Sequence, residues 1–203
     1  METSQVRCPS CGAPLQLSNR FVRMVTCGYC GSLNEVLPDH LASRGKVSAL
    51  VPLPTRFRVG QSGSIQGQRF SVLGRVRYGD GDAVWDEWLL GMADGALAWL
   101  EEDEGQWILG REEPLRGTAP PQSALRVGER IVLNGRSVVL TERCTAKVIG
   151  VEGELRSAVA PGEIVTFYEG SDGEGIAYLE YASNGVGAGY GRELARREVT
   201  LDS

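Results

Sequence analysis

Residues 58–72 read RVGQSGSIQGQRFSV, and residues 126–140 read RVGERIVLNGRSVVL. The Arg-Val-Gly start recurs, and the glycine of Gln66-Gly67 recurs at the same place in Asn134-Gly135. An Asn-Gly pair between apolar runs is a strong signal for a two-residue β-hairpin, because both turn positions need positive φ. The two stretches therefore predict two copies of one hairpin and raise the question whether a whole domain is repeated.

The pattern around each hairpin extends the repeat. After the first hairpin, short apolar runs alternate with turns at 79–82, 94–95 and 104–105, which predicts five strands in an antiparallel meander. Residues 176–180 (IAYLE) match residues 97–101 (LAWLE), with about eleven extra residues inserted before them in the second copy. We interpret the agreement in order and turn chemistry as a tandem duplication.

The sequence predicts an all-β fold, in which a zinc ribbon precedes two tandem small antiparallel β domains, each an open barrel or a small sandwich. The 27 glycines among 203 residues fit a chain with many tight turns. A half of this size buries little core alone, so the two copies are expected to pack together. The predicted segments are a zinc ribbon (1–38), a linker that could hold a short helical turn (39–55), a first β domain (56–116), a linker (117–123) and a second β domain (124–203).

Two cysteine pairs, CPSC and CGYC, stand near the N-terminus. Fifteen residues separate Cys8 and Cys11 from Cys27 and Cys30, a spacing typical of a four-cysteine zinc site. Four thiolates close the tetrahedral shell and leave no position for a reacting water, so we expect a structural Zn²⁺ that folds the ribbon. Two disulfides are the alternative, although the chain starts without an apolar signal region.

Composition narrows the classes of function. The chain has a single histidine, His40, which disfavours Ser-His-Asp and multi-histidine chemistry, so we expect no enzyme. The net charge is −5, and the first 58 residues hold more basic than acidic residues. This balance argues against nucleic-acid binding by the whole chain and leaves that function open for the ribbon. No apolar run is long enough to span a membrane, so we expect a cytoplasmic protein without a membrane-spanning segment.

The tetrapeptide WDEW, residues 85–88, is the most unusual in the chain. On a strand its first and third residues share one face, and its second and fourth share the other. One interpretation is a site for a cationic ligand or a peptide, with an aromatic wall and a carboxylate. The other is a core tryptophan with carboxylates paired across strands to Arg75 or Arg77.

An acidic run follows at residues 101–104, just before a turn glycine. It reads either as a solvated hairpin tip or as a platform for a polyamine or a basic partner, which Glu112 and Glu113 would join. Because WDEW and this run occur only in the first copy, we expect the binding surface there, with the second copy as a packing partner. The predicted ligand or partner surface comprises Trp85, Glu87, Trp88, Glu101, Glu102, Asp103 and Glu104.

The ribbon followed by VLGRVRY (72–78), WDEWLL (85–90) and WL (99–100) resembles bacterial zinc-ribbon proteins with domains of the domain-of-unknown-function family 4178. In the second copy the residues that correspond to WDEW are VTFY (165–168). The resemblance implies no enzymatic activity. Genes of this family tend to lie beside those for phage-shock-type membrane-remodelling proteins, small membrane proteins and polyamine-related enzymes, which implies an accessory role in such a system.

These observations lead to one preferred hypothesis and two alternatives. The preferred one is a non-enzymatic adaptor that has a structural zinc ribbon and binds a protein partner. The adaptor is expected to be an accessory of a membrane-stress or polyamine-linked bacterial system, and a membrane-associated protein is one candidate for the partner. The first alternative is a sensor for a small cation of the polyamine type. The second is nucleic-acid binding through the ribbon.

Overall fold

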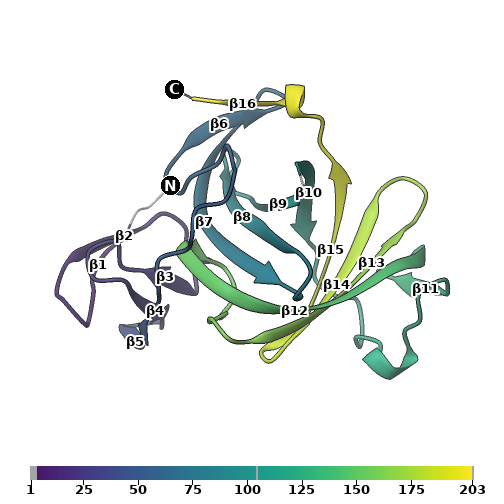
Figure 1. Ribbon diagram of the computed structural model, residues 1–203, viewed down its shortest axis with the longest axis horizontal. Helices are drawn as coiled ribbons and strands as arrows, with labels where there is room; N and C mark the ends of the chain where they lie inside the picture. The colour runs from purple at the N-terminus through teal and green to yellow at the C-terminus, as the bar shows by residue number, and fades with distance from the viewer. Residues whose placement is uncertain (1–3, 104, 203) are drawn as a thin grey trace.

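The computed structural model describes residues 4–103 and 105–202, and the fold within them is almost entirely β (Figure 1). Its helical elements are two single 3₁₀ turns, η1 (Gln122–Ala124) and η2 (Arg196–Glu198). No helix in this part of the chain is long and apolar enough to cross a bilayer. The prediction of an all-β fold is confirmed.

The first half folds as the meander that its turns predict. Gln66 and Gly67 have φ of 51° and 81°, the left-handed pair that a two-residue hairpin turn requires. The further turns fall where the sequence places them, at Gly81, Gly95 and Gly105, which have positive φ. The strands are β6 (Ser62–Ile65), β7 (Gln68–Gly79), β8 (Val84–Met92), β9 (Leu97–Asp103) and β10 (Gln106–Glu112).

The second half has five strands in the same order. Asn134 has a φ of 53° at the place that Gln66 takes in the first half, and these two are the non-glycine residues with positive φ in the described chain. Each sits at the first position of its hairpin turn, so the same backbone solution is used twice. The strands are β11 (Arg130–Leu133), β12 (Arg136–Leu155), β13 (Ile164–Ser171), β14 (Ile176–Ala182) and β15 (Gly185–Glu193).

Strands of both halves form one closed ring. β10 pairs with β15, and β12 pairs with β7, so the row of neighbouring strands returns to its start (Figure 1). The eight strands are antiparallel throughout, in the order β7-β8-β9-β10-β15-β14-β13-β12. The residues of the two predicted β domains, 56–116 and 124–203, therefore share this ring, whose side chains alternate between an inner and an outer face.

The seam between β7 and β12 depends on two glycines that face each other. Gly74 pairs with Gly153 across the seam. A Cβ at Gly74 would lie 2.0 Å from the carbonyl oxygen of Glu154, so no other residue fits without moving the backbone. The close approach lets the long strand β12 leave β13 and continue along β7.

The outer faces of the ring carry two separate apolar cores, and each is completed by the other half. The core of the first half, around Trp88 and Leu100, includes Leu194, which follows β15. The core of the second half, around Leu179, is contacted by Leu115, which follows β10. The C-terminal strand β16 (Val199–Leu201) also pairs with β6 of the first half. Neither half therefore has a complete core by itself.

The ribbon lies beside the ring and is joined to β12 (Figure 1). Its last strand falls in the segment 39–55, where the sequence suggested a helical turn; the segment instead pairs with β4, and Arg44 there forms an ion pair with Glu35. The strands are β1 (Ser4–Arg7), β2 (Pro14–Leu17), β3 (Met24–Thr26), β4 (Ser32–Val36) and β5 (Leu41–Lys46).

A third apolar core connects the ribbon with the inside of the ring. Met24 and Leu33 of the ribbon belong to the same buried cluster as Val76 and Val148 of the ring. At the joint, the Glu154 carboxylate accepts hydrogen bonds from the Ser18 backbone N–H (3.1 Å) and hydroxyl (2.7 Å). This core fills part of the inside of the ring.

Candidate functional site

The WDEW tetrapeptide lies on β8, and its side chains alternate as the sequence predicts. Asp86 and Trp88 are buried on the outer face, at 3% and 1% exposure. Trp85 and Glu87 point into the ring and line its cavity. Asp86 and Trp88 therefore fit the interpretation as core residues, and Trp85 and Glu87 fit the interpretation as a ligand site.

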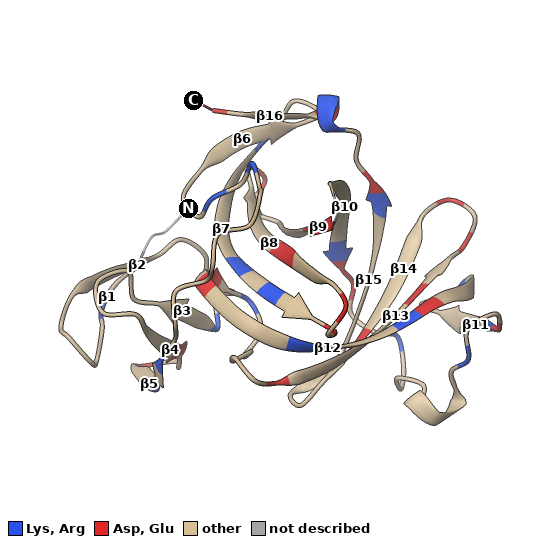
Figure 2. Ribbon diagram, viewed as in Figure 1, with Lys and Arg blue, Asp and Glu red and all other residues tan. Residues whose placement is uncertain are grey.

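Asp86 is the centre of a buried charge network. Its carboxylate accepts hydrogen bonds from Arg77 Nε and Nη2, both at 2.7 Å, and from Arg75 Nη1 at 3.3 Å. The Arg75 guanidinium also lies 4.9 Å from the ring centre of Trp88. In Figure 2 the blue bands on β7 lie beside the red band on β8. The expected cross-strand pairing to Arg75 or Arg77 is confirmed for Asp86.

Replacing Asp86 by alanine is expected to lower the free energy of unfolding by about 3–5 kcal/mol, because it leaves the buried Arg77 charge without its partner. Asp82→Ala is the matched control: this carboxylate is exposed in the β7–β8 turn, and its loss should change stability by about 0.5 kcal/mol or less. Urea unfolding of both variants measures the difference. Equal stabilities would contradict the assigned role of Asp86.

The acidic run divides between the two faces of β9. Glu101 points into the ring, and Asp103 lies at the mouth of the cavity. Glu102 instead belongs to the outer core, where Nε1 of Trp88 (3.3 Å) and Nε1 of Trp107 (3.2 Å) donate hydrogen bonds to its carboxylate. Glu104 lies outside the described residues. Neither expectation for the run, a solvated tip or a continuous platform, describes Glu102.

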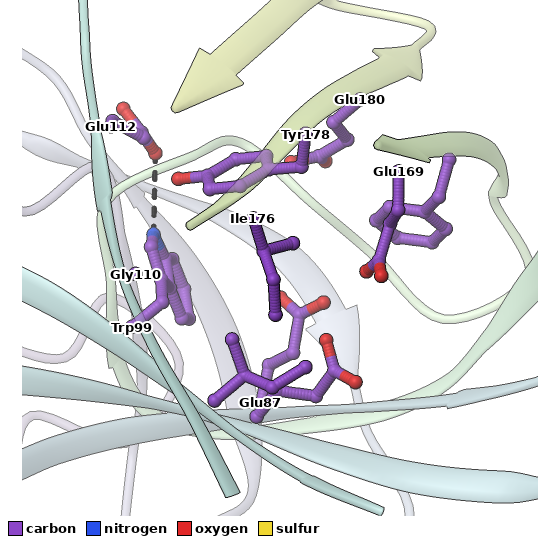
Figure 3. Close-up of a pocket in the computed structure, with 11 residues that line it drawn as sticks. Glu87, Trp99, Gly110, Glu112, Glu169, Ile176, Tyr178 and Glu180 are labelled. Atoms are coloured by element: carbon purple, nitrogen blue, oxygen red, sulfur yellow. Dashed lines mark hydrogen bonds between the residues drawn. The ribbon is translucent and has the colours of Figure 1, made fainter. Parts of the chain in front are cut away.

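The cavity occupies the inside of the ring between the two halves. In Figure 3 Glu87, Glu169 and Glu180 lie around a common space, with Trp99 and Tyr178 at its side. The cavity consists of two adjoining spaces, of about 50 Å³ and about 390 Å³, and Glu87, Glu101 and Glu169 line both of them. Four carboxylates of its wall come from four different strands: Glu87, Glu101, Glu169 and Glu180.

The second half contributes as much of the cavity as the first, which differs from the expectation that the first copy alone carries the surface. Glu169 and Glu180 were not among the predicted site residues. Glu180 takes the place of Glu101, and Tyr178 that of Trp99, in the sequence match between residues 176–180 and 97–101. The repeat itself was the signal that identifies Glu180, whereas nothing in the sequence indicated Glu169.

The cavity has no counter-charge for these four carboxylates. No Lys, Arg or His lines it within the described residues, and none of the four forms an ion pair there. Glu87 stands directly opposite Glu101 on the neighbouring strand, a like-charge pairing that destabilises a sheet. Glu112 differs, because it pairs with Arg156 at 2.8 Å and accepts a hydrogen bond from Trp99 Nε1 at 3.3 Å.

Burial and mutual repulsion hold protons on this cluster. Burial, with the charges of Glu169, Asp103 and Glu142, raises the pKa of Glu101 to about 8. Burial, with the charge of Glu112, raises the pKa of Glu180 to about 7. Burial raises the pKa of Glu87 well above its usual range, and Glu180 and Glu101 add to the effect. Near neutral pH the cluster is therefore partly protonated.

Aromatic side chains and one polar atom without a partner complete the wall. Trp85 and Phe167 meet edge to face, with ring centres 6.2 Å apart, beside the wide part of the cavity. The hydroxyl oxygen of Tyr178 is buried and has no hydrogen-bond partner among the described residues. A buried hydroxyl without a partner costs free energy, so the wall offers a ligand a hydrogen bond as well as apolar contact.

The four cysteines of the ribbon converge on a second site. Their sulfur atoms lie within 4.8 Å of one another, and those of Cys8 and Cys30, like those of Cys11 and Cys27, are 3.8 Å apart. All four are free, and a disulfide would need about 2.05 Å, so the alternative of two disulfides is not what the structure has. The arrangement is a metal site.

Turns with left-handed glycines shape the two cysteine knuckles. Gly12 and Gly31 have φ of 75° and 71°, and their N–H groups donate to the carbonyl oxygens of Cys8 and Cys27 at 2.8 Å. The Ser32 hydroxyl lies 3.2 Å from the Cys8 sulfur. The knuckles are thus fixed by the backbone.

Comparison with known proteins gives one match. A family model with the description "Domain of unknown function (DUF4178)" matches residues 58–195. This range runs through both halves and includes every residue that lines the cavity, while the ribbon lies before it. The chain matches none of the curated proteins and none of the solved structures with which it was compared.

Proposed function

Because the chain belongs to the family described as Domain of unknown function (DUF4178), a description that names no activity, we propose its function from the cavity: the protein binds a small organic cation of the polyamine type inside the ring. The observation that carries the proposal is the set of four carboxylates without counter-charge inside the ring. Enclosing like charges costs free energy, and a bound cation removes that cost.

The chemistry of the wall fits an alkylammonium ion. Each ammonium group donates charge-assisted hydrogen bonds to carboxylates such as Glu87 and Glu101. The faces of Trp85 and Trp99 attract positive charge, and Phe167 and Ile108 offer contact to methylene groups. The absence of lysine and arginine from the described wall favours a cation over an anion.

Titration calorimetry with spermidine at physiological salt tests the proposal. Wild-type protein is expected to bind one spermidine, and Glu87→Gln with Glu101→Gln should weaken binding about 100-fold, since each removed carboxylate takes away a charge-assisted hydrogen bond. Glu129→Gln is the matched control, because this carboxylate is exposed and does not line the cavity. Heat that disappears with added salt, or that Glu129→Gln reduces equally, would show mere screening of surface charge.

For the ribbon we propose a structural Zn²⁺. The 3.8 Å between sulfur atoms is the separation that two thiolates have when both bind one tetrahedral Zn²⁺ at about 2.3 Å. Cys8, Cys11, Cys27 and Cys30 would hold it, with no place left for a reacting water.

We also infer that the two halves are copies of one ancestral unit. The shared hairpin conformation at Gln66 and Asn134 supports this, as does the equivalent role of Leu194 and Leu115 in closing the outer cores. The cavity would then be the interface between the copies.

The adaptor role is the second candidate. The ribbon favours it, because Tyr29 is 76% exposed and Phe21 is 42% exposed there, with the Arg20 guanidinium 4.8 Å from the Phe21 ring. If the protein is an adaptor, we propose that its protein partner belongs to a membrane-stress or polyamine-linked system. Affinity purification from the native host should recover a specific partner with the wild type. The double variant Phe21→Ala and Tyr29→Ala should no longer recover it. Equal recovery with this variant would show that the ribbon takes no part in binding the partner.

A further inference from the structure

The first hairpin of each half has an outer edge, and the two edges differ. In the first half, β6 pairs with β7 on one side and with the C-terminal strand β16 on the other. In the second half, β12 is the one pairing partner of β11 among the described strands. Figure 1 shows β16 along β6 and no described strand in the corresponding place beside β11. The outer edge of β11 is therefore open.

The contacts of β16 show how such an edge is filled. The middle residue of β16 lies directly opposite Ser64, and the Asp202 N–H donates a hydrogen bond to the Ser62 carbonyl oxygen at 2.9 Å. Backbone groups of alternate residues in a strand point to the same edge. Counted from the two hairpin turns, Arg130 corresponds to Ser62 and Val132 to Ser64. The backbone groups of Arg130 and Val132 therefore point to the open edge.

Two prolines explain why the chain does not fill this edge itself. Leu115 follows β10 as Leu194 follows β15, and each closes an outer core. Counted from these leucines, Pro120 and Pro121 take the places of the first two residues of β16. Proline has no N–H to donate to a ladder. The Tyr181 hydroxyl of β14 instead donates to the Pro120 carbonyl oxygen at 2.5 Å, so this segment is held at β14.

The side chains of β11 indicate which segment fits the edge. Leu133 is buried in the core of the second half and Ile131 packs against that core, whereas Val132 between them is 75% exposed. A strand in the register of β16 places apolar residues opposite Leu133 and Ile131. The next residue, which is Asp202 in the chain's own strand, lies opposite the exposed Arg130. Opposite charges in directly facing positions stabilise such a pair of strands.

We propose that the open edge of β11 binds an extended segment of a protein partner, antiparallel to β11, with an apolar-any-apolar-acidic pattern like Val-Thr-Leu-Asp of residues 199–202. The backbone groups of Arg130 and Val132 supply the ladder hydrogen bonds, and the core of the second half receives the two apolar side chains. No residue of β11 lines the cavity, so this inference is independent of the cation site.

Fluorescence polarisation with a labelled peptide of residues 197–203 (REVTLDS) tests the edge in the full-length protein. Saturable binding to the wild type is expected at β11, since the protein's own β16 occupies β6. Val132→Pro should weaken binding at least tenfold, because it removes an outward N–H while the ladder to β12 stays intact. Val127→Ala is the matched control and should change nothing, since this valine is also exposed, at 54%, but lies outside β11.

A charge exchange tests the register without relying on proline. Arg130→Asp should weaken the peptide about fivefold, and a peptide with Asp202→Arg should restore binding to this variant. Absence of saturable binding, equal effects of Val132→Pro and Val127→Ala, or no restoration by the exchanged peptide would overturn the proposal. A dimer in sedimentation that Val132→Pro abolishes would overturn it as well, since the edge would then be filled by a second copy of the chain.

Discussion

Spermidine affinity is expected to rise about 800-fold between about pH 6 and about pH 8.5, because two carboxyl groups must lose protons to bind it. Loss of charge from the ligand would change affinity in the opposite direction. Glu180 and Glu101 have pKa values near 7 and 8, so both must lose protons to meet the ligand as carboxylates. Each proton released makes affinity change about tenfold per pH unit in the range where its carboxyl group titrates. The two terminal ammonium groups of the ligand remain charged, because alkylammonium groups have pKa values near 10.

Calorimetry in two buffers of different ionisation enthalpy measures the protons released on binding. Glu101→Gln should remove the upper part of the pH dependence, and Glu129→Gln should leave the whole curve in place. An affinity that stays constant across this range, with no proton release, would contradict the partly protonated cluster.

The same carboxyl groups should also make the stability of the ligand-free protein depend on pH. Their pKa values are raised in the folded protein, so the folded state holds protons that the unfolded chain releases above about pH 4.3. Their contribution is therefore fully present at acidic pH and is lost as pH rises through 7 and 8. Spermidine should restore thermal stability most strongly at the alkaline end.

Metal removal is expected to unfold the ribbon. Binding of Zn²⁺ to small four-ligand domains contributes about 10–16 kcal/mol at neutral pH, far more than a ribbon of this size gains from its own apolar cluster, which includes two of the cysteines. A chelator should abolish hydrogen-exchange protection in β3, β4 and β5. The ring should stay folded at a lower melting temperature, because its two outer cores contain no ribbon residue while the third contains Met24 and Leu33.

Elemental analysis and two variants check this expectation. Wild type should carry one zinc per chain, Cys27→Ser should lose it, and Cys144→Ser should retain it, since Cys144 lines the cavity and does not belong to the group of four cysteines. A ribbon that keeps its exchange protection after complete metal removal would contradict a structural role for the ion.

Local patterns in the sequence determine most of the strands. Turn residues such as Gln66-Gly67 and Asn134-Gly135 act on their own neighbours, so the hairpins could be predicted. The cysteine spacing predicted the metal site for the same reason, and strand alternation separated Asp86 from Glu87.

The ring and its cavity could not be predicted in this way. Closure depends on the pairing of β7 with β12 and of β10 with β15, contacts between residues far apart in sequence. Glu169 has no counterpart in the WDEW pattern, so only the three-dimensional arrangement brings it beside Glu101. Glu102 looked like its acidic neighbours, and only the positions of Trp88 and Trp107 show that it is part of a core.

A crystal structure of the protein with spermidine tests the central claim most directly. We expect the ligand inside the ring, with its nitrogens beside the carboxylates of Glu87, Glu101, Glu169 and Glu180. A spermidine bound only on the outer surface, with the cavity unchanged, would contradict the proposed cation site.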